Sequence, residues 1–291
     1  MEHVREMVTG PIIPTPGAVM ECTKLLYEYL GDLIVLDVGG ATTDLHSVTV
    51  ESDQVARLMI SPEPKAKRTV EGDLGVYVNR WKVVESIGEE KLREQCREQG
   101  FSMEHALETY RAIPKTEEEV KLVELLTREA VVKAAERHAG RLRYIYGPSG
   151  RSTVAEGKDL TQVKYIVGTG GALTRLPHRE EIMREITRCN ESGMLLLPGE
   201  HAQILVDHDY IMASLGVLSK RYPQAAARLL EQSLGITFPE RKAEEPVPVC
   251  NKELSRLGTQ RQQREEELQR HIEECEAMGY DMSAYRENKP K

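Results

Sequence analysis

The pattern of apolar and polar positions divides the first sixty residues into a helix followed by strands. Four apolar residues recur at helical spacing: Val19, Cys22, Leu26 and Leu30. Thr15-Pro16 stands just before them and is a helix-start signal, because proline fits the first turn of a helix. The apolar run 33–38 and the β-branched run 44–50 then predict two strands, and residues 55–60 predict a third.

The rest of the chain predicts helices with a few short strands between them. Asp73 can cap a helix that begins near Leu74, and residues 74–145 are expected to be mostly helical. Thr116 and Glu119 have the spacing of a capping box. The remaining expected elements are polar loops at 61–68 and 146–153, a strand within 164–177, a helix at 178–189, strands at 194–197 and 203–206, and helices at 209–220 and 223–234.

Composition and charge narrow the class of protein. The 291 residues are 40% hydrophobic and 30% charged, which suits a soluble chain with one large domain or two smaller ones. The net charge of −8 argues against a nucleic-acid partner, and no apolar run approaches the ~20 residues that cross a membrane. The five cysteines form no CxxC pair, as expected for reduced thiols of a cytoplasmic protein. Residues 241–291 are polar and predict a helical tail.

The motif Asp37-Val38-Gly39-Gly40-Ala41-Thr42-Thr43-Asp44 joins the first two predicted strands. We call residues 39–42 the first glycine turn. A turn of small residues can point several backbone N–H groups at one anion. Acids on both sides of such a turn make sense when a cation such as Mg²⁺ accompanies the anion. The alternative is an ordinary hairpin, because Gly, Asp and Thr are common turn residues; we favour phosphate binding.

A second glycine turn, Gly168-Thr169-Gly170-Gly171, follows the apolar residues 165–167. Ligands of open α/β sheets lie outside the carboxyl ends of the strands, so two such turns in one domain predict a common cleft. One turn would hold phosphates while the other packs against the base and ribose. The alternative for the second turn is that its glycines only permit entry into a helix.

The order and separation of these motifs resemble the superfamily of actin, sugar kinases and heat-shock chaperone ATPases. Its second phosphate motif is similar to residues 37–44, and its adenosine motif is similar to residues 167–177. The likeness becomes specific over five segments, which together resemble the MutL-type accessory proteins of glutamate mutase (unrelated to the mismatch-repair protein of that name). These segments are PTPGAVMECTKLL, DVGGATTDLHSV, TVEGDLG, GKDLTQVKYIVGTGGALTRLP and DHDYIMASLGVLS.

The resemblance implies an α/β fold: an actin-like (ribonuclease H-like) ATPase domain, in which helices flank a mixed β-sheet. Residues 33–240 would form the second domain of such an ATPase, with a helical insertion at about 74–145. Residues 1–32 would be a linking segment and helix from an N-terminal half, and 241–291 a helical tail. Full-length members carry an earlier phosphate motif, which we do not find before residue 37. We therefore expect a missing N-terminal half or a second subunit to complete the site.

The resemblance also implies roles for single residues. Asp37 would hold Mg²⁺ through water and Asp44 would be a second outer-sphere acid; the alternative for both is turn capping. Glu71 would orient the nucleotide or water, as would Asp73, although helix capping is the simpler duty for both. The phosphates of ATP would be held by the N–H groups of Gly39, Gly40 and Ala41 and by the hydroxyls of Thr42 and Thr43. The adenosine would lie against Gly168, Gly170 and Gly171.

Two histidine-containing stretches are expected to be structural instead. His46 alternates outward on a predicted strand and should lie at the surface. His201, Asp207, His208 and Asp209 crowd a short stretch in which metal binding is conceivable, but capping of the next helix by Asp207 or Asp209 is the simpler interpretation.

Three functions remain open on this evidence. The first is an ATP-dependent, chaperone-like reactivating factor that exchanges damaged for intact cobalamin in an adenosylcobalamin-dependent mutase or aminomutase. The second is a small-molecule kinase of the same superfamily, which would need a substrate pocket and a general base. The third is a nucleotide-binding subunit that does not hydrolyse ATP.

Overall fold

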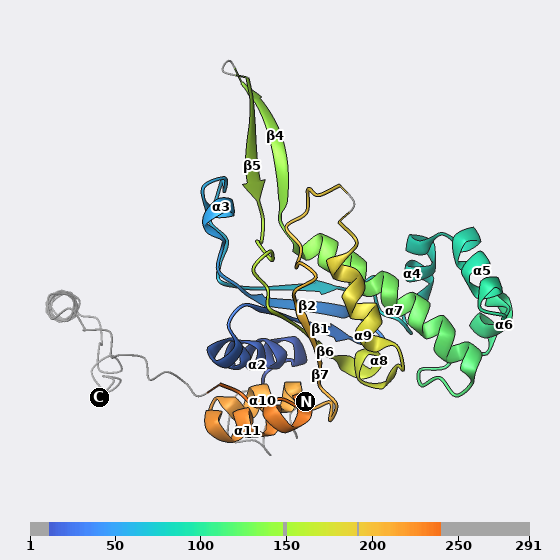
Figure 1. Cartoon of the computed structure of the whole chain (residues 1–291). Coiled ribbons are helices and arrows are strands. Elements are labelled where there is room, and N and C mark those ends of the chain that lie inside the picture. The colour runs from blue at the N-terminus through green and yellow to red at the C-terminus, as the bar shows by residue number, and fades with distance from the viewer. Residues whose placement is uncertain (1–11, 148–149, 191, 240–291) are drawn as a thin grey trace, which may run out of the picture. The chain divides into compact units, whose positions relative to one another are not determined.

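The computed structural model describes residues 12–147, 150–190 and 192–239 (Figure 1). Its five-stranded sheet has the order β3-β2-β1-β6-β7 and consists of β1 (Leu33–Val38), β2 (Thr43–Val48), β3 (Ala66–Glu71), β6 (Tyr165–Thr169) and β7 (Gln203–Val206). A separate hairpin consists of β4 (Arg141–Gly147) and β5 (Gly150–Glu156). The helices are α2 (Thr15–Leu30), α3 (Asp53–Ala56), α4 (Arg80–Ile87), α5 (Glu89–Glu98), α6 (Met103–Glu108), α7 (Glu117–His138), α8 (Gly170–Arg175), α9 (Arg179–Arg184), the 3-10 turn Glu185–Thr187, α10 (Met212–Ser219) and α11 (Pro223–Leu234). The predicted tail 241–291 lies outside the described residues.

The strand β1 lies at the centre of the sheet, as its almost wholly buried sequence LIVLDV requires. It pairs antiparallel with β2, and β2 pairs antiparallel with β3, so the first three strands form a meander. On the other side of β1, β6 and β7 run parallel to it. The prediction of a mixed sheet is therefore confirmed, and the three parallel strands bring their carboxyl ends to one edge.

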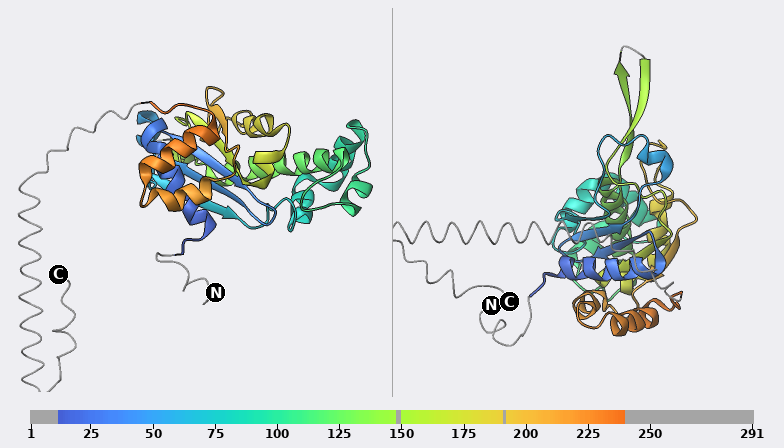
Figure 2. Two further views of the ribbon diagram at one scale, coloured as in Figure 1. Left: turned by 90° about the horizontal axis from the view of Figure 1, so that it is seen from below. Right: turned by 90° about the vertical axis from the view of Figure 1, so that its left-hand side faces the viewer.

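Helices cover both faces of this sheet, which confirms the flanking helices that we expected (Figure 2). Alternate residues of β1 divide between the two faces: Leu33 and Val35 pack with α2, α10 and α11, whereas Ile34 and Leu36 pack with α7, α8 and α9. Asp37 continues the alternation of Leu33 and Val35. Its side chain therefore leaves the sheet on the side of α2 and α10.

Residues 80–138 are mostly helical, as predicted, but residues 141–145 at the end of the predicted helical region belong to the strand β4. The long helix α7 contacts α4, α5 and α6 and also reaches the strands β1, β2 and β3. The capping box at its start is confirmed, because the Thr116 hydroxyl accepts from the N–H of Glu119 and the Glu119 carboxylate accepts from the N–H of Thr116. Residues 74–79, where we expected the first helix of this region to begin, form turns instead, and α4 begins only at Arg80.

The third strand of the meander lies later in the chain than predicted. Residues 55–60 follow the start of the short helix α3, and Val55, Leu58 and Met59 pack in a small cluster at the base of the hairpin. The third strand is β3, and the first half of it falls within the predicted polar loop 61–68. As an edge strand with only partly buried side chains, β3 needs no apolar alternation, and the sequence therefore does not reveal it.

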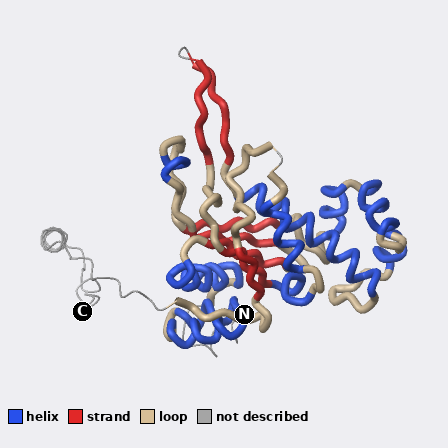
Figure 3. Tube along the Cα trace, viewed as in Figure 1, coloured by secondary structure: helices blue, strands red, loops and turns tan. Residues whose placement is uncertain are grey.

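The predicted loop 146–153 is also wrong, because its described residues, 146–147 and 150–153, belong to the strands β4 and β5 of the hairpin (Figure 3). Residues 194–197 do not form the predicted strand; they contribute a single bridge from Leu195 to Arg141. The helices predicted at 209–220 and 223–234 are confirmed as α10 and α11. The hairpin was missed because its strands are stabilised by pairing with each other and carry mostly exposed residues, so they show no buried apolar run.

Candidate functional site

Two aspartates face each other at the edge of the sheet where β1 ends. Asp37 of β1 pairs directly with Asp44 of β2, so both side chains leave the same face of the sheet. Thr169, at the end of β6, is the neighbour of Asp37 on the other side. Asp207 follows the last residue of β7 and accepts a hydrogen bond from the Thr169 hydroxyl at 2.8 Å. Acidic groups therefore gather at the edge where ligands of such sheets bind.

The acidic pair of Asp37 and Asp44 is only partly compensated by its surroundings. Burial, together with the negative charges of Asp44 and Asp207, raises the pKa of Asp37 to about 6. Burial also raises the pKa of Asp44, although a hydrogen bond from the Thr42 hydroxyl (3.4 Å) and the charge of Arg68 act against it. The second carboxylate oxygen of Asp44, Oδ1, is buried and has no partner among the described residues. A cation at this place would supply the missing positive charge.

The carbonyl oxygens of the first glycine turn are fixed by the segment that precedes α4. Four hydrogen bonds make this connection: Val76 N–H to Gly39 O (3.2 Å), Tyr77 N–H to Gly40 O (2.9 Å), Val78 N–H to Gly40 O (2.7 Å) and the Asn79 amide to Ala41 O (2.8 Å). Gly75 permits the approach, because a Cβ there would lie 2.2 Å from the carbonyl of Ala41. The turn is therefore joined directly to the start of the helical region.

The amide side of the same turn is open. The N–H of Gly39 donates to Thr42 O at 2.9 Å, whereas the N–H groups of Gly40 and Ala41 have no acceptor within the described part of the chain. Both of these residues are exposed. Two of the three N–H groups that we predicted to hold phosphates are therefore free donors, in the turn that connects Asp37 with Asp44.

The two threonines of the motif have different surroundings. Thr42 is partly exposed, and its hydroxyl lies toward Asp44. Thr43 is fully buried, and its hydroxyl donates to the carbonyl of Leu74 at 2.8 Å. Thr43 thus makes a structural hydrogen bond, and Thr42 is the hydroxyl that remains beside the acidic pair.

In the second glycine turn, packing accounts for two of the three glycines. A Cβ on Gly168 would lie 2.6 Å from the sulfur of Met183 in α9. Gly170 has a φ of +84°, and a Cβ there would lie 2.5 Å from Oδ1 of Asp37. Gly171 is exposed and has open space around its Cβ position. Of the three residues predicted to face adenosine, Gly171 is the one with an open surface.

Glu71 and Asp73 are both bound to an arginine, although the charge of Glu71 still raises the pKa of Asp44. Arg137 of α7 donates to Glu71 at 2.6 Å and to the two oxygens of Asp73 at 2.7 and 2.8 Å. The hydrogen bond from Arg137 lowers the pKa of Asp73. Because Glu71 pairs with Thr43 rather than with Asp44, its side chain leaves the opposite face of the sheet. The structure therefore does not bring Glu71 together with Asp37.

Tyr210 belongs to this edge, although no sequence pattern indicates it. Its φ of 55° is positive, which within the described residues holds for no other non-glycine residue. Burial and the negative charges of Asp37 and Asp207 raise the pKa of its hydroxyl. A positive φ at a bulky residue is uncommon and marks strain of the kind found at functional sites.

Asp207 caps α10, as predicted, because its carboxylate accepts from the N–H groups of Ile211 and Met212. His46, by contrast, is fully buried rather than exposed, and neither ring nitrogen has a hydrogen-bond partner among the described residues. Burial lowers the pKa of His46 to about 3. The prediction failed because α2 packs over the face of β2 that carries His46.

The described residues contain neither a cluster of side chains that could hold a metal ion by itself nor a membrane-spanning helix. No three His, Cys, Asp or Glu side chains of the described residues lie together in a way that could hold a metal ion, so Mg²⁺ would need water or phosphate oxygens as well as Asp37. None of the helices in the described residues is long and apolar enough to span a membrane.

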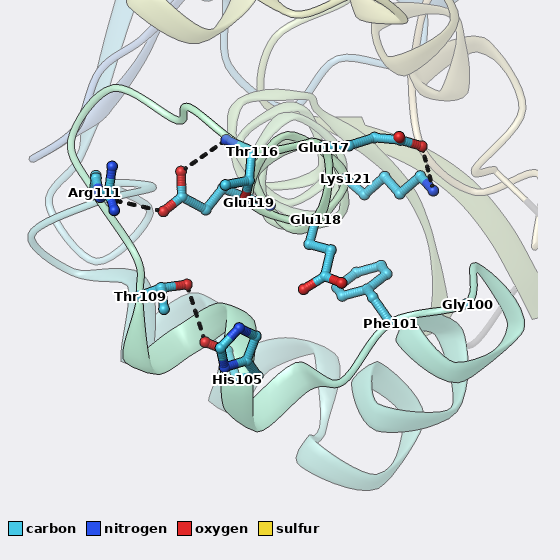
Figure 4. A pocket seen from close by; sticks show the side chains of 10 residues that line it. All are labelled: Gly100, Phe101, His105, Thr109, Arg111, Thr116, Glu117, Glu118, Glu119 and Lys121. Carbon is cyan, nitrogen blue, oxygen red and sulfur yellow. Dashed lines mark hydrogen bonds and ion pairs between the residues drawn. The ribbon is translucent and has the colours of Figure 1, made fainter.

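A pocket of about 500 Å³ lies elsewhere, in the helical region between α5, α6 and α7 (Figure 4). Several charged groups on its wall already have partners: Glu117 binds Lys121 at 2.8 Å, and Glu119 caps α7 and lies 3.5 Å from Arg111. These pairs leave little unsatisfied charge for a ligand. We therefore place the candidate site at the edge of the sheet rather than in this pocket.

The fold and this edge define an α/β protein in which free amide donors lie beside an acidic pair that is only partly compensated. Residues 1–234 match the family described as MutL protein. "Protein MutL" of Clostridium tetanomorphum is 34% identical over 246 residues, which cover 80% of this chain and 53% of the relative. The chain belongs to the MutL family, and the resemblance found in the sequence is confirmed. It spans about half the length of the curated relative that it matches.

Proposed function

We propose that this chain is the nucleotide-binding part of an ATP-dependent reactivating factor for an adenosylcobalamin-dependent mutase or aminomutase, such as glutamate mutase. One observation carries the proposal: the free N–H groups of Gly40 and Ala41 lie in the turn between Asp37 and Asp44, an acidic pair whose charge is only partly compensated. ATP with Mg²⁺ meets both needs, because phosphate oxygens accept from N–H groups and the cation neutralises the acids. Membership of the MutL family supports the choice of a mutase as partner.

An actin-like ATPase fold is part of this proposal. In its support, an antiparallel meander is followed by two parallel strands, and both glycine turns lie at the ends of the neighbouring strands β1 and β6. The chain matches about half of its relative, so the remaining groups of an ATP site would come from further sequence of this kind or from a second subunit.

Different residues at this edge would bind the phosphates, the Mg²⁺ ion and the adenosine. The N–H groups of Gly40 and Ala41 and the hydroxyl of Thr42 would hold phosphate oxygens. Asp37 would hold Mg²⁺ through water, with Asp44 as the acid behind it. When bound, Mg²⁺ supplies charge neutralisation and orients the phosphates. Gly171 would offer its open surface to the adenosine.

Four hydrogen bonds between the first glycine turn and residues 76–79 connect the proposed phosphate site to the helical region. A ligand that moves the turn also moves the segment that leads into α4. A nucleotide shifts a conformational equilibrium only as far as its affinities for the two states differ. A chaperone-like ATPase could use this connection to alter its hold on a mutase.

One observation favours a second candidate, a nucleotide-binding subunit that does not hydrolyse ATP. Glu71, the acid that we predicted to orient water, is bound to Arg137 and lies on the other face of the sheet from Asp37. Glu71 would then not act on the water that attacks ATP.

Calorimetry with ATP and Mg²⁺ tests the site. We expect the chain to bind, Asp37→Asn to weaken binding at least about tenfold, and the control Asp73→Asn to bind like the wild type, because the carboxylate of Asp73 is already bound by Arg137. Binding that is unaffected by Asp37→Asn or by removal of Mg²⁺ would contradict the assignment.

Reactivation tests the function. A mutase inactivated with a cobalamin that lacks its adenosyl group is mixed with the completed protein, ATP and fresh adenosylcobalamin. We expect turnover to return with the wild type and not with Asp37→Asn. Recovery without ATP would exclude the mechanism, whereas nucleotide binding without any recovery or hydrolysis would favour the second candidate.

A further inference from the structure

The β4–β5 hairpin stands away from the rest of the described chain (Figure 1 and the right-hand view of Figure 2). Seven residue pairs link its strands, from Arg141 and Glu156 at the base to Gly147 and Gly150 near the tip. Packing is confined to the base, where Leu142 and Ala155 join a small apolar cluster. A two-stranded ribbon is marginally stable by itself, so its outer part adds little to the stability of the domain.

The outer part of the hairpin carries large apolar side chains in water. Tyr144, Ile145 and Tyr146 have exposed fractions of 47%, 50% and 79%. Tyr144 and Tyr146 share one face of the ribbon, and Arg151, the cross-strand partner of Tyr146, lies with its guanidinium 4.4 Å from the centre of the Tyr144 ring. Tyrosine and arginine are the side chains that most often dominate the binding energy of protein interfaces.

The charge of the hairpin is opposite to that of the chain as a whole. It contains three arginines and one glutamate, whereas the net charge of the chain is −8. Glu156 forms an ion pair with Arg143 at 2.7 Å, whereas Arg141 and Arg151 form no ion pair within the described residues. A surface that complements this hairpin would therefore present carboxylates around an apolar hollow.

We propose that the outer β4–β5 hairpin, led by Tyr144, Tyr146 and Arg151, is the surface by which this protein docks on its mutase. The inference rests on the proposed function, which requires such a partner, and it assigns the contact to a ribbon that is separate from the nucleotide edge. The mutase surface supplies the carboxylates for Arg141 and Arg151 and an apolar hollow for the tyrosine rings.

The test measures the affinity of the 291-residue chain for purified glutamate mutase by biolayer interferometry at two salt concentrations. We expect the double variant Tyr144→Ser/Tyr146→Ser to bind at least about tenfold more weakly, and Arg151→Glu to lose most affinity at low salt. The control is Tyr222→Ser, which removes a similarly exposed tyrosine at 51% from another surface and should bind like the wild type. All variants should keep the wild-type melting temperature and ATP affinity.

Several outcomes would overturn the docking assignment. These are equal binding by the wild type and the hairpin variants, no binding of the wild type to the mutase, or an effect of the variants that is confined to self-association or to binding of a random DNA duplex. The ATP measurements keep this result distinct from the proposed function. Hairpin variants that bind the mutase normally refute the docking surface alone, whereas absent nucleotide binding and reactivation refute the function.

Discussion

The two glycine turns, residues 39–42 and 168–171, have similar sequences and end neighbouring strands, but their glycines serve different purposes. In the first turn, Gly40 and Ala41 are exposed and their N–H groups are free. In the second, Gly168 and Gly170 are buried, and each makes room for a neighbouring element. A glycine-rich turn after a strand therefore has two meanings, either an open set of donors or a close contact within the fold.

The difference follows from what packs on each turn. Residues 75–79 hold the first turn only by its carbonyl oxygens, which leaves its amide side in water. The second turn leads at once into α8 and lies directly against β1, so its backbone is enclosed. Substitutions in the second turn should therefore act on stability, and substitutions around the first turn should act on both stability and ligand binding.

The largest effect is expected for Gly170→Ala. The new Cβ would lie 2.5 Å from Asp37 at a φ of +84°, and the strain together with the overpacking should cost about 3 kcal/mol of unfolding free energy or more. Urea denaturation measures the loss. The matched control is Gly171→Ala, which has open space and should stay within about 0.5 kcal/mol of the wild type. Equal stability of the two variants would show that the second turn is not enclosed.

Asp37→Asn should stabilise the ligand-free protein at neutral pH while it weakens binding of ATP and Mg²⁺. The pKa of Asp37 is raised from its ordinary value near 4 to about 6 in the folded state, so the folded protein binds the proton of Asp37 more tightly than the unfolded chain does. The free energy of unfolding therefore falls as the pH rises from about 4 to about 6. The loss amounts to as much as about 3 kcal/mol above pH 6.

The pH dependence is best measured as the difference between the wild type and Asp37→Asn. The buried His46 and His138 titrate with the opposite sign, since burial lowers the pKa of each to about 3, and they are common to both proteins. Urea titrations at pH 4 and pH 8 should show the variant gaining on the wild type at the higher pH. An equal difference at both values would refute the raised pKa.

Gly75→Ala should weaken the contact that fixes the first turn. Its Cβ would lie 2.2 Å from the carbonyl of Ala41, and the displacement should cost about 2 kcal/mol and reduce the affinity for ATP. Gly72→Ala is the control, because nothing lies within 4 Å of its Cβ position. A melting curve and a calorimetric titration of both variants would show whether the first turn depends on this approach.

The smallest effect is expected for Asn79→Ala. The amide of Asn79 joins Ala41 O at 2.8 Å and Gly72 O at 2.7 Å, and the loss of these two neutral hydrogen bonds should cost about 1 kcal/mol. Amide exchange of Gly40 and Ala41 should become faster if the bond steadies the turn. Unchanged exchange and stability would mean that the backbone bonds of residues 76–78 suffice.

The sequence by itself determined the elements whose signals are local. The apolar run of β1, the helical stripe of α2 and the capping box at Thr116 each depend on neighbouring residues, and each was predicted correctly. The same holds for the position of both glycine motifs at strand ends and for the cap at Asp207. Short-range spacing carries this information because hydrogen bonds of helices, caps and turns span only a few residues.

Only the tertiary structure decided which polar groups are free. Arg137 binds Asp73 from 64 residues away and also binds Glu71, and α2 covers His46. Neither the pairing of these two acids nor the burial of the histidine could therefore be foreseen. The strand β3 and the β4–β5 hairpin were missed for a related reason, since their pairing partners rather than an apolar pattern hold them. A carboxylate, an amide or a glycine is available to a ligand only if no distant part of the chain packs against it. Such long-range contacts cannot be read from the local order of residues.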